Sequence, residues 1–115
     1  MMTPFDMRLS VCEMLPELFC RTPRSITIWC RSDTTFNPTS RTKTLDWELH
    51  GLKVCLAATE SLNLRVKIEH IGKKWFIQIW TNGAFGESLI VENEDLLSAW
   101  LEALCRARFP EKFEA

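Results

Sequence analysis

Histidine and cysteine are the residues of this 115-residue chain that could perform acid–base, nucleophilic or metal chemistry. General acid–base catalysis needs histidines or paired carboxylates gathered in one pocket, but His50 falls on a predicted helix and His70 beside a predicted turn. Metal sites need clustered soft ligands, and the five cysteines contain no pair with zinc-finger spacing. No nucleophile motif and no glycine-rich phosphate loop are present. We therefore predict a chain that is not an enzyme and uses no cofactor and no metal.

The composition is that of a globular domain, and we expect a single domain over residues 1–115. Hydrophobic residues make up 46% and charged residues 25%, and the formal net charge is -1. These values exclude a disordered tail and a nucleic-acid binder that relies on bulk positive charge. The odd cysteine count, the lack of a secretory signal and the lack of a long apolar run predict reduced thiols, a cytoplasmic location and no membrane partner.

Charge is distributed unevenly along the chain. Residues 21–43 carry five basic side chains against one acidic, and residues 75–115 carry seven acidic side chains against three basic. Two interpretations remain open: a mixed, solvated surface, or a basic patch that attracts an acidic partner.

Both ends of the chain have the signatures of helices. Thr3 and Pro4 suit the cap and first position of an N-terminal helix, which Pro16 should kink or restart before the element ends near residues 21–23. Asn93 is the expected cap of the last helix, with acidic residues in the first turn and arginines in the last turn.

Residues 44–59 are predicted to form a helix that is apolar on two sides. Four leucines make one stripe at helical spacing, and a second stripe on the opposite side contains Trp47. Such a helix needs cover on both sides. The second cover is either another helix of the same chain or a partner protein.

Alternating residues and two turn signals predict an antiparallel meander. Gly72-Lys73 suits a type II′ hairpin turn and Asn82-Gly83 suits a type I′ turn. The first turn pairs Ile68 with Ile77, and the second pairs Ile77 with Ser88. The predicted strands are 64–71, 74–81 and 84–91, with one further strand at 25–31. The order α-β-α-β-β-β-α then gives an α+β domain, in which two or three helices pack in layers on a four-stranded sheet.

The second face of this meander is also apolar, which bears on function. We expect this second face to carry Phe76, Trp80, Phe85 and Leu89, with Arg65 and other polar residues around them. Two alternatives exist: the N-terminal helix covers this face in a sandwich, or the face is an exposed patch that binds a partner.

The C-terminal half resembles small bacterial and prophage-encoded proteins of the phage ABA-sandwich or toxin-immunity type. The resemblance rests on the tryptophan-containing hairpin around residues 73–83 and on the Ala- and Leu-rich helix that begins at Asn93. It implies a helix–sheet–helix fold and a mobile-element or toxin-neutralising setting, and it implies no active site.

We therefore predict a small protein-binding module: an inhibitor, an immunity protein or an accessory protein that binds another protein or itself. The alternative is a single-stranded nucleic-acid binder that uses the basic and aromatic sheet face, and a small enzyme comes third. The expected partner-binding residues are Phe76, Trp80, Phe85, Arg65 and Trp47.

Overall fold

The computed structural model describes residues 2–21, 27–81 and 87–113. Within them the chain forms three α-helices and two three-stranded antiparallel sheets, which confirms the predicted α+β class. The elements in order are α1 (Pro4–Glu13), β1 (Phe19–Cys20), β2 (Trp29–Cys30), β3 (Lys43–Thr44), α2 (Trp47–Ser61), β4 (Arg65–Ile71), β5 (Lys74–Trp80), β6 (Ser88–Asn93), α3 (Leu96–Arg108) and a 3-10 turn (Pro110–Lys112).

Helix α1 begins as its sequence predicts. The Thr3 hydroxyl accepts a hydrogen bond from the Asp6 amide at 3.1 Å, and the Asp6 carboxylate accepts one from the Thr3 amide at 3.0 Å. This capping box satisfies amide groups that the first turn would otherwise leave unpaired. The helix ends at Glu13, so the expectation that it kinks or restarts at Pro16 and runs to residues 21–23 is wrong. Proline removes an amide donor and disfavours the helical conformation of the residue before it, so the helix stops instead.

The predicted strand 25–31 is present only as the short β2, and residues 22–26 lie outside the described part of the chain. Strand β2 pairs with β1 and β3 in a small sheet of its own. The expectation of a fourth strand in the meander is therefore wrong. The loop that follows β2 is organised by the buried Asn37, whose amide donates to the carbonyls of Cys30 at 3.3 Å and Arg41 at 2.7 Å.

Aspartates cap the other two helices, and in the last helix the aspartate takes the place of the expected cap, Asn93. Asp46 accepts hydrogen bonds from two amides in the first turn of α2, so that helix begins at Trp47 and not at residue 44. Asp95 caps α3, while the expected cap Asn93 accepts a hydrogen bond from the Asp95 amide at 2.9 Å. Both differences follow from local competition between neighbouring side chains that can act as caps.

Helix α3 is the centre of the molecule. It packs against α1, α2, β5 and β6, and it buries residues around most of its circumference. The Trp100 indole donates a hydrogen bond to the Thr59 hydroxyl of α2 at 3.0 Å. Gly51 of α2 lies against Leu97, and a methyl group at Gly51 would come within 2.8 Å of that side chain. The two helices therefore approach each other closely.

The first hairpin of the meander confirms the predicted register. Ile68 pairs with Ile77, and the residues on either side pair as expected from Arg65 opposite Trp80 to Ile71 opposite Lys74. Gly72 has a φ of +64°, the positive value that the first position of a type II′ turn requires.

The second hairpin has a different register from the predicted one. Ile77 pairs with Val91, not with Ser88, which is a shift of three positions along β6. An odd shift turns every side chain of the strand to the other face. The observed register places Leu89 and Val91 toward α3, where the predicted one would have placed Ser88 and Ile90, so it buries more apolar surface.

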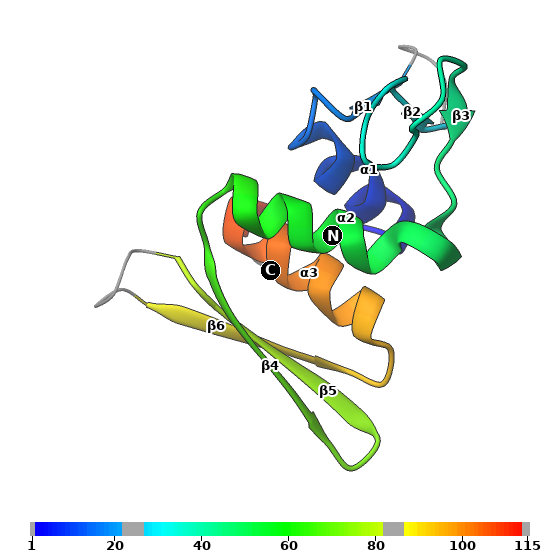
Figure 1. Cartoon of the computed structure of the whole chain (residues 1–115). Helices are drawn as coiled ribbons and strands as arrows, with labels where there is room; N and C mark the ends of the chain where they lie inside the picture. The colour runs from blue at the N-terminus through cyan, green and yellow to red at the C-terminus, as the bar shows by residue number, and fades with distance from the viewer. Residues whose placement is uncertain (1, 22–26, 82–86, 114–115) are drawn as a thin grey trace.

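The layers are visible in Figure 1. The small sheet and α1 lie at one end, α2 and α3 lie in the middle, and the meander lies at the other end with α3 above it. Ile77 and Ile79 of the central strand are fully buried and Val91 is nearly so. Among the described residues, no helix is long and apolar enough to cross a bilayer.

Candidate binding surface

The meander has one face packed on α3 and one face that no described element covers (Figure 1). Side chains alternate along a strand, so the residues next to the buried isoleucines of β5 point away from α3. We call this set the open face. It consists of Arg65, Lys67, Glu69, Ile71, Lys74, Phe76, Gln78, Trp80, Ser88, Ile90 and Glu92.

Four apolar side chains lie among the charged and polar ones of the open face. Phe76 and Trp80 are half-buried, and Ile71 and Ile90 are 58% and 62% exposed. A shallow hollow of about 130 Å³ runs between Ile71, Phe76 and Ile90, and Lys67, Glu69 and Gln78 complete its lining. A solvated antiparallel face normally carries polar residues, so this arrangement is typical of a contact surface.

Most charges on the open face already have partners. Lys67 pairs with Glu69 at 2.7 Å, and Lys74 pairs with Glu92 at 3.2 Å. Arg65 lies over the Trp80 ring, with its guanidinium carbon 4.8 Å from the ring centroid. Within the described residues Arg65 has no carboxylate partner, so its charge is available to an acidic group of a ligand.

The structure brings three of the five predicted site residues together. Phe76, Trp80 and Arg65 share the open face, whereas Phe85 lies outside the described residues. Leu89, expected on this face, packs against the core instead, and Ile90 takes its place.

The prediction missed Ile71 and Ile90, and the signal that could have found Ile90 is the alternation within β6 itself. Burying Leu89 and Val91 together leaves Ile90 on the opposite side.

Trp47 is not part of the open face. It begins α2, and α3 lies between α2 and the meander (Figure 1). Its ring lies under the Arg8 guanidinium at 5.2 Å and lines a groove of about 670 Å³ between α2 and the start of α3.

The leucine stripe predicted for this helix is largely uncovered. Leu49 is 69% exposed, and Leu52 and Leu56 are more than two-fifths exposed. This gives a second apolar surface, distinct from the open face.

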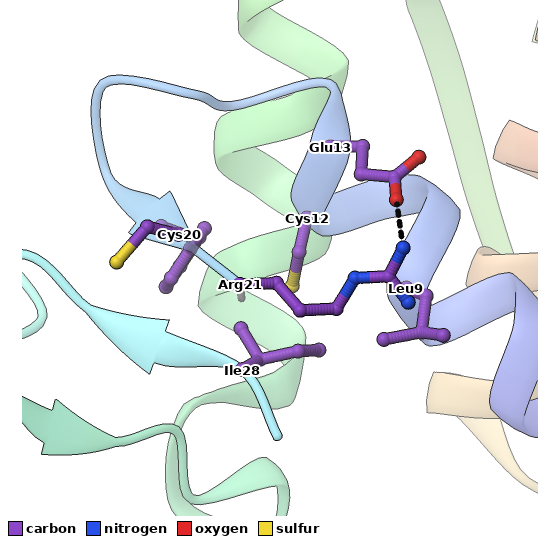
Figure 2. Close-up of a pocket in the computed structure, with 7 residues that line it drawn as sticks. Leu9, Cys12, Glu13, Cys20, Arg21 and Ile28 are labelled. Carbon is purple, nitrogen blue, oxygen red and sulfur yellow. Dashed lines mark hydrogen bonds and ion pairs between the residues drawn. The ribbon is translucent and has the colours of Figure 1, made fainter. Parts of the chain in front are cut away.

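A third feature is the pocket of about 190 Å³ between α1, β1 and β2 (Figure 2). Arg21 reaches across it to Glu13 at 3.2 Å, so the two charges neutralise each other. Burial raises the pKa of the Cys12 thiol that points into this pocket, with neighbouring cysteines adding to the effect. A protonated thiol beside a closed ion pair indicates packing rather than nucleophilic chemistry.

The histidines contact aromatic rings, and several of the cysteines are close neighbours within the core. His50 contacts Phe36 edge-on at 5.8 Å, and His70 stacks flat on Trp75 at 4.1 Å. All five cysteines are free thiols. No group of three or more His, Cys, Asp or Glu residues within the described ranges is arranged to hold a metal ion.

Comparison with protein-family models, with curated proteins and with solved structures finds no match for this chain. The resemblance to prophage-encoded proteins therefore stays a prediction, and the open face is interpreted from its own geometry.

Proposed function

We propose that this chain is a small non-enzymatic protein-binding module that docks its partner on the open face of the meander. One observation carries the proposal: the three helices of the described chain lie away from this face, while two aromatic and two aliphatic side chains lie exposed or half-exposed on it. A chain this small has little apolar surface to spare, and exposed apolar patches in soluble proteins mark interaction sites.

The chemistry of the open face describes the partner. Its centre fits an apolar side chain that fills the hollow between Phe76 and Ile90. Arg65, held flat on Trp80, fits a carboxylate at the rim next to an aromatic or aliphatic group. Tryptophan and arginine are the residues that most often dominate binding energy at protein interfaces. The partner is therefore a protein with an apolar anchor beside an acidic residue.

A protein partner fits this surface better than single-stranded nucleic acid. Readers of single strands combine stacking rings with a groove of unpaired cations that follows the backbone. Here both lysines of the open face are paired with carboxylates, and those carboxylates would repel phosphates. Inhibitors, immunity proteins and accessory subunits, including those of mobile elements, are proteins that act by binding another protein, and we propose that the chain is one of them.

The test compares retention of partner protein by the tagged wild-type chain and by three variants in lysate of the native host. Trp80→Ala and Ile90→Lys alter the open face, and Leu49→Lys is a matched control on the exposed stripe of α2. We expect each open-face variant to bind the partner protein about 30-fold more weakly than the wild type, because each removes one side chain that dominates the binding energy. The control variant should bind like the wild type, and circular dichroism should show all three folded.

Two outcomes would overturn the proposal. Equal retention by the folded open-face variants would mean that the partner docks elsewhere. Loss of the complex on nuclease treatment, together with a steep dependence of binding on salt, would identify a nucleic acid as the ligand instead.

A further inference from the structure

Strand β4 is an edge of the meander, because the strand order is β4-β5-β6. In a two-residue hairpin the residues next to the turn form a hydrogen-bonded pair, and such pairs then alternate along the ladder. The pair closing this turn is Ile71 with Lys74. The backbone N–H and C=O groups of Val66, Ile68 and His70 therefore point outward, to a side where the described chain places no strand.

This edge lacks most of the usual protection against pairing with another strand. Natural edge strands are commonly short, bulged, interrupted by proline or lined with charged side chains. Of these features, the described β4 has only charges, and they are of both signs, at Arg65, Lys67 and Glu69. Strand β4 pairs in continuous register over its seven residues. Ile68 at its centre is 38% exposed, although its neighbour Ile77 is fully buried, because α3 packs on β5 and β6.

The side chains of β4 are complementary to their own reversed copy. Lys67 and Glu69 flank Ile68 in the sequence, and both lie on the open face, one positively and the other negatively charged. We propose that β4 pairs antiparallel with β4 of a second copy of this chain, across a two-fold axis at Ile68. Each Lys67 then lies opposite Glu69 of the second copy. The Lys67–Glu69 ion pair within each chain, at 2.7 Å, becomes part of a four-residue network of alternating charges across the axis.

Backbone geometry supports the same register. In an antiparallel pair centred on Ile68, the outward N–H and C=O groups of Ile68 bond to those of Ile68 in the second copy. The outward groups of Val66 bond in the same way to those of His70 in the second copy. Lys67 and Glu69 then occupy a non-hydrogen-bonded position, where facing side chains approach most closely. A two-fold axis requires this kind of self-complementary patch.

The other edge of the sheet lacks this property. An antiparallel self-pairing of β6 about Ile90 would set Ser88 against Glu92 and would form no ion pair. Charge complementarity therefore selects β4.

The resulting assembly would join the two meanders into one continuous sheet and would double the open face. The proposal does not rest on the proposed function, since self-association is measured on the pure chain with no partner present.

The test is sedimentation equilibrium of the wild-type chain and three charge variants. Lys67→Glu places like charges opposite each other at both pairs, Glu69→Lys does the same with lysines, and the double variant Lys67→Glu/Glu69→Lys restores opposite charges with the signs exchanged. Both side chains are exposed, so folding should be unaffected. We expect a wild-type dimer that is at least about tenfold weaker in each single variant and recovers in the double variant.

Hydrogen exchange supplies a second readout. The amides of Val66, Ile68 and His70 should gain protection as concentration rises, while the amides of Glu111 and Lys112 in the 3-10 turn should not. A chain that stays monomeric up to about 1 mM would overturn the proposal. A Lys67→Glu variant that dimerises as strongly as the wild type would overturn the proposal as well. So would loss of the dimer in Leu49→Lys, measured in the same way, because that result would assign the dimer interface to α2.

Discussion

The register of β6 decides which residues form the open face, and truncating two neighbouring side chains tests it. Val91 is 4% exposed and faces α3, whereas Ile90 is 62% exposed and faces away. Val91→Ala removes two buried methyl groups, worth about 1.6 kcal/mol at roughly 0.8 kcal/mol each. The cavity left between β6 and α3 raises the expected loss of unfolding free energy to about 2 to 3 kcal/mol.

Ile90→Ala is the matched variant, and it removes a larger side chain. Because that side chain is mostly in water, the expected change in unfolding free energy is within about 0.5 kcal/mol. Urea unfolding followed by tryptophan fluorescence at 25 °C measures both variants, and equal m-values would show that the denatured states are comparable. A larger loss for Ile90→Ala than for Val91→Ala would refute the register, and with it the composition of the open face.

Four further predictions concern the core, the thiols and the first helix. Thr59→Val leaves the buried Trp100 indole N–H without its acceptor and should lower the unfolding free energy by about 1 to 3 kcal/mol in urea titrations, whereas Thr59→Ser should keep most of the stability. Cys20 is partly exposed and the other four thiols are buried, so a thiol reagent followed by mass spectrometry should label Cys20 first; simultaneous labelling of all five in the native state would contradict this packing. Burial raises the pKa of Cys105 to about 12 and also raises the pKa of Cys12 and Cys55, so the stability that these protonated thiols provide is present below pH 9 and should be lost as pH rises above it, which urea titrations between pH 8 and about 10.5 would show. The backbone and hydroxyl hydrogen bonds from Thr3 lower the pKa of the Asp6 carboxyl from 3.8, so its stabilisation is present above pH 3.8 and is lost as pH falls below that value; an NMR titration midpoint at or above 3.8 would disprove the capping box.

Local signals predicted the first hairpin correctly because the turn alone determines the register of its two strands. Gly72 supplies the positive φ of a tight turn, and a two-residue turn fixes every pair from Ile71 back to Arg65. The predicted register of the second hairpin was wrong because the local preference for a turn at Asn82-Gly83 competed with packing of the strand on α3. The Thr81 amide donates a hydrogen bond to the Glu87 carbonyl. The segment that connects the two strands is therefore longer than the two residues Asn82-Gly83 of the predicted turn. Burial of Leu89 and Val91 against α3 outweighed the local preference.

The short strands and the helix caps were harder to predict for a different reason. Strands β1, β2 and β3 have two residues each, too few to show alternation, and their pairing depends on contacts far apart in the sequence. The two-sided pattern of α2 was recognised, with Val54 and Ala58 buried. Which side the chain itself covers is a tertiary property, and Leu49 lies on the side that it leaves open.

The prediction of Phe76 and Trp80 as site residues depended on alternation alone, which determines the face of a strand but not what covers that face. The three helices could have enclosed the meander from both sides. Instead α1 packs on α2 and α3, and this arrangement leaves the open face without a helix.

The most direct test of the central claim is an NMR footprint of the captured partner on the isotope-labelled chain. Our account predicts that the largest shift changes fall on Phe76, Trp80 and Ile90, with the Trp80 indole N–H among them. Changes confined to the exposed stripe of α2, from Leu49 to Leu56, with the open face unaffected, would contradict it.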